Sequence, residues 1–347
     1  MLFAVDQASG ELVHRGVEGR DVFSSEEEAL HMVRTRLCGG KALTTIVRGH
    51  AFLGLVLTPL QAMVLVAVEV RRDPLPAGHS VCTVVKSQWV RAHAACAPFS
   101  AAHIKADDVG VERLREFAVS GHHFYSETTD LSRPFPSTHA PTDYDPEYCW
   151  NQWLAGPFER AGLRSCCVVL LQGLGCSRCI ACNGGNISLA VITRKSIANP
   201  GTRYNARGLN DVAGAGNELE SEQIVWLPSE PGAASGSAGV QGEVFSTYLW
   251  RRGTVPVHWR HEMTSTLTAP KMVINENPYV GVADFFAACH ARYSHLMGMQ
   301  FDDAAPLTVV NLLRCDPESG ETGLSEVCQQ SCVCACARAC LCVCARA

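Results

Sequence analysis

The sequence predicts an α/β protein, α+β overall, with a β-rich N-terminal part followed by a part in which strands on a mixed sheet alternate with helices. Short β-branched runs separated by Gly and Pro fill the first 110 residues, and amphipathic helical patterns enter among the strands after that point. The composition, 47% hydrophobic and 18% charged over 347 residues, is typical of a folded chain. A net charge of -5 gives no support for a nucleic-acid partner, because nucleic-acid binders carry a basic surplus.

Five strands are predicted in the first part, at Leu2–Val5, Leu43–Val47, Ala51–Leu57, Met63–Val70 and Ser80–Val85. Residues 51–68 carry no charge and approach the length of a membrane-spanning helix. Pro59 would break such a helix, so we expect a hairpin there and no transmembrane span. Ser25 to Glu28 form a capping box, which predicts the start of a helix.

Helices and strands alternate in the second part. A helix is predicted over Asp107–Val119 and a strand end at Phe124-Tyr125. A second helix should begin at Asp145 as cap, carry Trp150, Trp153 and Leu154 as its apolar stripe, and end at Gly156-Pro157. The remaining expected elements are strands at Val168–Leu171 and Leu189–Thr193, an exposed linker at Pro228–Gly242, a helix at Val282–Leu296 and a buried central strand at Leu307–Leu313.

Cysteine is the unusual residue of this chain. Seven of its 18 cysteines fall in the last twenty residues, and the sequence from Ser331 onward is of low complexity. We expect residues 315–347 to be a disordered tail, with the true reading frame lost shortly after Arg314. The first ten residues show no secretory signal, so reduced thiols in the cytoplasm are expected.

Two cysteine patterns have possible chemical meanings. The tail matches Cys-x5-Arg at Cys332 to Arg338 and at Cys340 to Arg346, but neither match follows a strand or contains the glycine of a phosphate-binding loop. The series Cys176, Cys179 and Cys182 has the spacing of a zinc or iron-sulfur site, although no fourth ligand is evident. A metal-binding protein and free thiols in a surface loop both remain open, and no metal is assigned.

Basic residues and glycines are interleaved between residues 192 and 226. Arg194, Lys195, Arg203 and Arg207 could converge on phosphate groups, because a guanidinium offers two parallel donors to paired oxygens. The alternative, which spacing alone favours, is that these cations form ion pairs with Glu218, Glu220 and Glu222.

The same run contains an ordered series of short motifs. Within the run these are Arg194 with Ser196, Gly201-Thr-Arg-Tyr204, Arg207-Gly208 and Asn217-x-x-Glu220-x-Glu222-Gln223. Before the run lie Asp130-Leu-Ser-Arg-Pro134, Trp150-Asn-x-Trp-Leu154 and Val168 to Gly173. After it lie Trp250-Arg-Arg-Gly-Thr254 and Asn311-Leu-Leu-Arg314. In this order they resemble the SAC-domain (suppressor-of-actin) phosphoinositide phosphatases. The residues of these motifs are most similar to those of the long plant and algal branch of the family, which carries a WW module.

The resemblance covers residues 1–314 and implies an N-terminal SAC subdomain over residues 1–160 and the first part of the catalytic subdomain over residues 161–314. It implies hydrolysis of inositol-ring phosphates on membrane phosphoinositides by a cysteine thiolate, without metal or cofactor, by a cytoplasmic protein peripheral to membranes. The family's nucleophile loop, of the type Asn-Cys-x-Asp-x-Leu-Asp-Arg-Thr-Asn, is absent from this sequence.

Without that loop no catalytic residue is assigned, and the chain as written is expected to be inactive. The residues expected to contact the headgroup or support the loop are Arg203, Arg207 and Arg252, with Glu220 and Glu222 orienting them. The alternative reading is an inactive, truncated module that binds phosphoinositide or protein.

Overall fold

A computed structural model describes most of the chain. The described residues are 49–58, 60–94, 100–182, 185–201, 206–227, 244–262, 271–296, 307–313 and 321–335, with strand backbone at 2–5, 12–16, 19–23 and 340–344 and single positions at 25, 27, 28 and 31.

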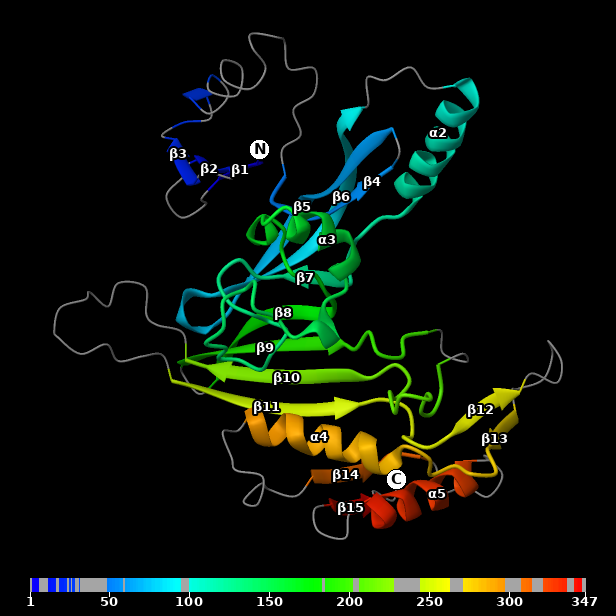
Figure 1. The fold of residues 1–347 in the computed structure, drawn as a ribbon. Coiled ribbons are helices and arrows are strands. Elements are labelled where there is room, and N and C mark those ends of the chain that lie inside the picture. Colours follow the sequence, from blue (N-terminus) through cyan, green and yellow to red (C-terminus); the bar gives the residue numbers. More distant parts are fainter. Residues whose placement is uncertain are drawn as a thin grey trace. The chain divides into compact units, whose positions relative to one another are not determined.

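The largest element of the fold is an antiparallel sheet of eight strands in the order β11-β10-β9-β8-β7-β6-β5-β4 (Figure 1). Its strands are β4 (Ala51–Leu57), β5 (Gln61–Pro74), β6 (Ser80–Ala94), β7 (His123–Tyr125), β8 (Leu171–Cys182), β9 (Gly185–Lys195), β10 (Leu219–Trp226) and β11 (Phe245–Arg252). There are three smaller sheets among the described residues. The first contains β1 (Leu2–Val5), β2 (Leu12–Gly16) and β3 (Gly19–Phe23). The second pairs β12 (Trp259–Glu262) with β13 (Lys271–Ile274), and the third pairs β14 (Leu307–Asn311) with β15 (Cys340–Cys344).

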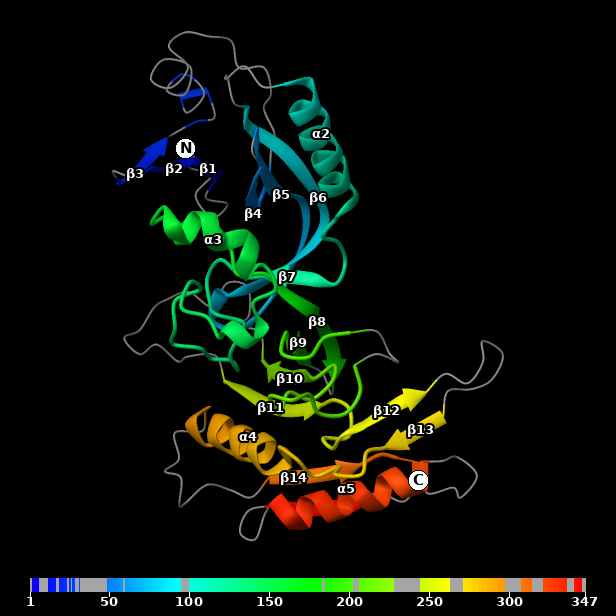
Figure 2. The same ribbon diagram turned by 45° about the vertical axis from the view of Figure 1, so that its right-hand side comes forward.

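Four α-helices lie in the described part of the chain. They are α2 (Ala101–Glu116), α3 (Gln152–Arg160), α4 (Val282–Leu296) and α5 (Glu321–Ala335), and short 3-10 turns occur at Pro76–Gly78, Pro146–Tyr148 and Arg164–Cys166. Helix α2 runs alongside β6 in both ribbon views (Figures 1 and 2). The α/β class expected from the sequence, α+β overall, is confirmed.

The chain divides into two compact units that are discontinuous in sequence. Unit 1 contains Met1–Arg194 and Glu222–Tyr248, and unit 2 contains Lys195–Ser221 and Leu249–Ala347. Unit 1 has two main apolar clusters, one around Phe124 and Ile192 and one around Leu65 and Tyr125. Unit 2 has its own cluster, in which Val257, Phe286 and Leu324 are buried.

The predicted hairpin around Pro59 is confirmed, because β4 and β5 pair antiparallel on either side of it. No helix among the described residues combines the length and the apolar character needed to cross a bilayer. At the predicted capping box, the Glu28 amide donates a hydrogen bond to Ser25 Oγ at 3.2 Å. The expected strand at residues 43–47 and the linker at 228–242 lie outside the described residues.

The predicted helix after Asp145 is wrong in its limits. Asp145 caps only the 3-10 turn, where its side chain accepts from the Glu147 amide, and the α-helix begins at Gln152 and continues through Pro157 to Arg160. Trp153, placed on the apolar stripe by the sequence, is 75% exposed, and the buried positions are Ala155 and Phe158. Trp150 precedes the helix, so the i, i+3 relation between Trp150 and Trp153 that defined the predicted stripe does not exist.

Two expectations near the C-terminal end also fail. The strand β14 is not buried throughout, because alternate side chains such as Val310 are exposed. The expectation of a disordered tail does not hold for residues 321–335, which form α5. Leu324, Cys328 and Cys332 recur every four residues and are buried, since a free cysteine packs as a small apolar side chain.

Asn151 joins three segments of unit 1 through its buried side chain. Its Nδ2 donates to the carbonyl oxygens of Leu53 and Val168 at 2.7 and 2.8 Å, and its Oδ1 accepts from the Leu170 amide at 2.9 Å. These bonds tie β4 and the segment entering β8 to the start of α3. Buried backbone groups need such partners, so the amide fixes the position of all three segments.

We expect Asn151→Ala to lower the free energy of unfolding by about 3 kcal/mol, because it leaves buried backbone groups without partners. Urea unfolding followed by fluorescence measures the loss. The control is Gln152→Ala at the neighbouring exposed position, which should change stability by less than about 0.5 kcal/mol. Equal stability of the two variants would contradict this role of Asn151.

Candidate functional site

Three glutamates occupy alternate positions at the start of β10. Glu218, Glu220 and Glu222 are buried, and Glu220 and Glu222 have no exposed surface. Side chains two residues apart in a strand point to the same side of the sheet, so the sequence spacing alone aligns these carboxylates. A buried carboxylate requires a cation or several donors, and each of the three has an arginine.

In unit 1, Glu222 pairs with Arg194 of β9, and both side chains are fully buried. The Arg194 guanidinium also donates to the carbonyl oxygens of Leu131 and Arg133, the latter at 2.9 Å. The second Glu222 oxygen accepts from the Phe135 amide at 2.7 Å. The pair therefore fastens residues 131–135 to the sheet through donors and acceptors that are all satisfied.

In unit 2, the other two glutamates have equally specific partners. Arg251 of β11 donates to both oxygens of Glu218, at 2.9 and 2.6 Å. Arg292 of α4 donates to both oxygens of Glu220, at 3.0 and 3.3 Å. Burial, and next the charge of Glu220, raise the pKa of Tyr293, so its hydroxyl keeps its proton and donates to Glu220 at 3.3 Å.

The structure does not bring the five expected site residues together as one group. Glu220 and Glu222 pair with Arg292 and Arg194, and Arg203 lies outside the described residues. Arg207 is half-buried, with its guanidinium carbon 5.5 Å from the centre of the Trp259 ring. Arg252 is exposed at the end of β11.

The ion-pair interpretation of the basic run is confirmed for Arg194. The other two arginines that pair with the glutamates, Arg251 and Arg292, lie outside the run. Strand alternation could have identified Arg251. Arg251 and Arg252 point to opposite sides of β11, so only one of the two can face the glutamates. No local signal marks Arg292, which lies 72 positions from Glu220 in the sequence.

A glycine-containing turn in unit 2 positions Arg207 beside Trp259. Gly208 has a φ of +66°, and a Cβ there would lie 2.4 Å from the Val257 carbonyl oxygen, so the backbone approach excludes a side chain. The Gly208 amide donates to Thr254 Oγ1 at 3.1 Å, and the Leu209 amide donates to Val257 at 3.0 Å. A guanidinium held over an indole is stabilised by the ring's negative face while its edge stays able to donate.

The cysteine series on β8 does not form a metal site. Cys179 lies an odd number of positions from Cys176 and Cys182 on the strand, so its side chain points to the opposite side. Among the residues that the structure describes, no three metal-binding side chains gather.

Three buried thiols of unit 1, those of Cys82, Cys149 and Cys167, lack the character of a nucleophile. Burial raises the pKa of Cys82 and Cys149, and raises that of Cys167 to about 12, so these groups stay protonated. Cys332 of the first Cys-x5-Arg match is buried in α5, which begins eleven residues earlier. It therefore lacks the place at a helix N-terminus that a phosphate-binding thiolate uses.

Glu222→Ala should lower the free energy of unfolding by about 3 to 5 kcal/mol, because it leaves the buried Arg194 charge without its carboxylate. The matched control is Glu112→Ala, which breaks an exposed ion pair with Arg115 and should cost about 1 kcal/mol or less. Chemical unfolding of both variants provides the comparison. Similar losses for the two would show that the Arg194–Glu222 pair does not hold the segment as described.

Several curated proteins are similar to this chain over most of its length. A polyphosphoinositide phosphatase of Schizosaccharomyces pombe is 22% identical over 278 residues, which are 78% of this chain and 32% of that protein. The phosphatidylinositol-3-phosphatase SAC1 of Arabidopsis thaliana is 25% identical over 264 residues, or 74% of this chain and 27% of that protein. The phosphoinositide phosphatase SAC4 of the same plant is 24% identical over 285 residues, which are 80% of this chain and 32% of that protein.

The chain therefore spans about a third of the length of these relatives. The family model described as the SacI homology domain matches residues 50–336, a range that includes β4, the arginine and glutamate pairs of β10, and α5. The match also extends beyond Arg314, the predicted end of the resemblance. The chain belongs to the SacI homology domain family.

Proposed function

We propose that this chain is part of a SAC-type phosphatase that removes inositol-ring phosphates from phosphatidylinositol phosphates. The observation that carries the proposal is the family match over residues 50–336, together with relatives whose names are phosphoinositide phosphatases. The ordered motifs from Asp130 to Arg314 support membership of the long plant and algal branch. We retain the division into an N-terminal subdomain over 1–160 and a first catalytic part over 161–314 as part of the proposal.

We further propose that this polypeptide binds phosphoinositide without turning it over. Its sequence contains no Asn-Cys-x-Asp-x-Leu-Asp-Arg series, and each described thiol with a shifted pKa is held in the neutral form. A phosphatase of this kind needs a thiolate to attack phosphorus, so binding is the chemistry that remains. The proposed setting is the cytoplasmic side of a membrane, without cofactor or metal.

Among the expected headgroup contacts, Arg252 has the clearest support. It is exposed, and among the described residues no carboxylate pairs with it. Arg207 is held by its turn and by Trp259, which limits its side-chain freedom before a ligand arrives. Arg203 remains a proposed contact from the motif alone. Glu220 and Glu222 would act at a distance, by fixing strands, because their arginines occupy both carboxylates.

We expect the chain to bind a water-soluble, short-chain phosphatidylinositol phosphate and to release no inorganic phosphate from it. Calorimetry measures the affinity, and a phosphate assay measures turnover. Arg252→Ala should weaken binding about tenfold, since it removes one charge-assisted contact, whereas Arg160→Ala, at an exposed arginine of α3, should leave affinity unchanged.

Sustained phosphate release would contradict the loss of the nucleophile. Absence of binding to the soluble lipid, or equal binding by both variants, would contradict the headgroup assignment.

A further inference from the structure

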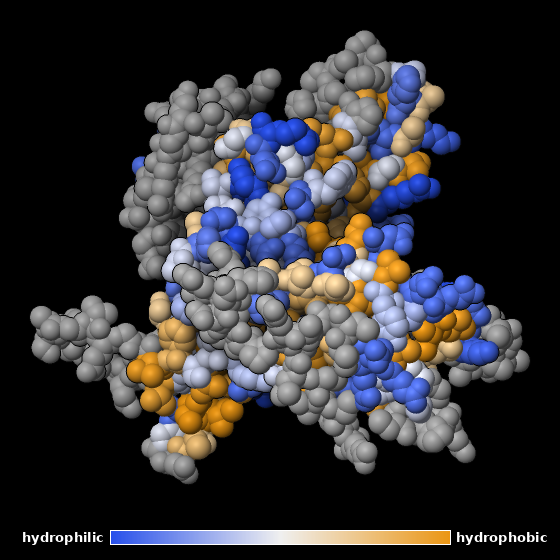
Figure 3. Space-filling view, turned by 60° about the horizontal axis from the view of Figure 1, so that its bottom comes forward, coloured by the Kyte–Doolittle hydropathy of each residue, from blue (hydrophilic) through white to orange (hydrophobic). Residues whose placement is uncertain are grey.

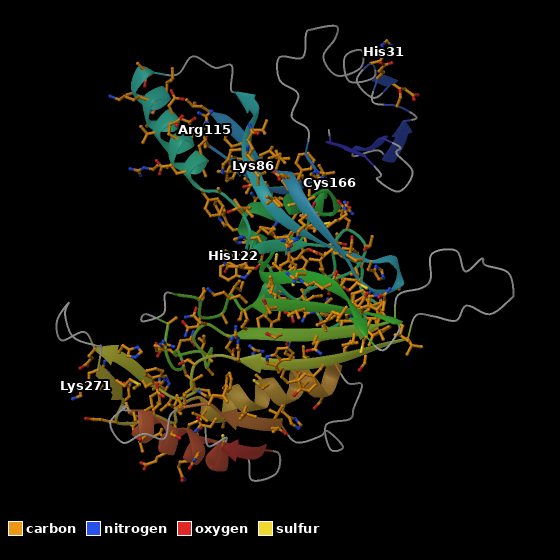
Figure 4. The ribbon with its side chains drawn as sticks, turned by 180° about the vertical axis from the view of Figure 1, so that it is seen from behind. His31, Lys86, Arg115, His122, Cys166 and Lys271 are labelled. Carbon is orange, nitrogen blue, oxygen red and sulfur yellow. The ribbon has the colours of Figure 1, made fainter. Side chains whose placement is uncertain are left out.

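Over β8 to β11, the side of the sheet opposite the cluster around Phe124 and Ile192 has no apolar cluster among the described residues, whereas over β4 to β7 that side carries the cluster around Leu65 and Tyr125. The cluster around Phe124 and Ile192 takes its side chains from the other side: Leu171 of β8, Ala190 of β9, Ile224 and Trp226 of β10, and Phe245 of β11. Alternation places the intervening residues of these strands on the opposite side. Figure 4 shows β8 and β9 from behind, and neither α2 nor α3, the described helices of unit 1, is drawn in front of them.

Six residues define this surface, which we call the open face: Leu174, Arg178, Ile180, Leu189, Val191 and Tyr248. Across the β8–β9 pair, Arg178 lies opposite Leu189 and Leu174 opposite Thr193, so these side chains are neighbours on one side. Leu174 is 47% exposed, Ile180 48% and Tyr248 68%, while Leu189 and Val191 are half-buried. Exposed apolar residues also occur elsewhere on the described surface (Figure 3). The charges around such residues therefore decide which kind of partner the surface can bind.

The charge of the open face is the opposite of that of the chain. The net charge of the sequence is -5, yet on this side of β8, β9 and the unit 1 parts of β10 and β11 none of the described residues is an aspartate or glutamate. Arg178 is exposed there, and no described carboxylate pairs with it. An anionic surface would therefore attract this side of unit 1 and repel the acidic remainder, which fixes an orientation.

The exposed side of α2 provides the contrast. Ile104 and Val109 are as exposed as Ile180, but three carboxylates lie among them on the same helix surface and outnumber the two basic residues there; the charged residues are Asp108, Glu112, Glu116, Lys105 and Arg113. Carboxylates next to apolar side chains oppose approach to anionic lipid. The open face combines aliphatic side chains, a tyrosine and an arginine, which is the composition found where proteins meet the headgroup region of a bilayer.

A second copy of the chain fits the open face less well. In a two-fold pairing the same surface would meet itself, so two copies of Arg178 would enter one interface that contains no described carboxylate to offset their charge. A lipid surface offers anionic headgroups to the arginine and an apolar layer to the aliphatic residues. We propose that the open face docks unit 1 on the surface of an anionic bilayer. This inference deepens the proposed function, on which it rests, because it names the membrane-facing side of a protein whose substrate is a lipid.

The test is sedimentation of the chain with phosphatidylcholine vesicles that contain or lack phosphatidylserine and contain no phosphoinositide. We expect binding that requires phosphatidylserine. Arg178→Glu should lower the partition coefficient roughly tenfold or more, because it replaces an attraction by a repulsion at the surface. Arg160→Glu makes the same charge change on α3 and should leave the partition coefficient within about twofold.

A second matched pair isolates the apolar contribution. Ile180→Ser should lower binding about fivefold, since it removes apolar surface that enters the headgroup region. Ile104→Ser, at a position 46% exposed on α2, should have no effect. All four substituted side chains are at least partly exposed, and circular dichroism melting confirms that the variants fold.

Three results would overturn the proposal: no phosphatidylserine-dependent binding, equal loss in each matched pair, or a concentration-dependent dimer in the absence of vesicles that Arg178→Glu abolishes. The last result would assign the open face to a second copy. Docking that depends on Arg178, without any binding of the soluble phosphoinositide, would support the open face and refute the proposed function.

Discussion

The buried ion pair between Arg194 and Glu222 is the interaction on which the first unit depends. Besides bonding to each other, the guanidinium and the carboxylate both form hydrogen bonds to the backbone of residues 131–135. One pair of side chains therefore orders a segment that has no regular secondary structure. Phe135, which this segment carries, packs into the apolar cluster that covers one side of the sheet. A cluster covered by a loop needs such a fixed point, because apolar contacts alone do not specify the path of a loop.

The three carboxylates of β10 explain why a motif rich in arginine and glutamate can be mistaken for a ligand site. Each carboxylate is saturated by an arginine from a different element: β9, β11 or α4. Two of these arginines are far away in the sequence. The glutamates of this motif therefore hold β10 in place through ion pairs with neighbouring elements. Residues that remain available for a ligand are the ones beside the pairs, such as Arg252.

Much of the fold could be predicted from local pattern. The hairpin around Pro59, the strand at Leu2–Val5 and the helix at Val282–Leu296 have the limits or the turn that β-branched runs and amphipathic spacing indicate. Prediction failed where a feature depended on distant residues. The true start of α3 depends on Asn151 meeting β4 and the segment before β8. The burial of Cys332 depends on an apolar cluster that also contains Val257 and Phe286, which lie far from it in the sequence. The candidate site was predicted only in part for the same reason, because strand alternation aligns the glutamates but does not select their arginines.

The division of the chain into units has a consequence for how the protein can be cut or synthesised. The chain leaves unit 1 after Arg194, returns at Glu222 and leaves again after Tyr248, so the two members of the buried pair stand on separate passes through the same unit. A fragment that ends at residue 194 would carry the arginine without its carboxylate. During synthesis on the ribosome, the loop at 131–135 likewise waits for a strand made some ninety residues later before it can be fixed. Fragments designed for expression should therefore keep β9 and β10 together, and a family boundary drawn between them would separate charges that fold as a pair.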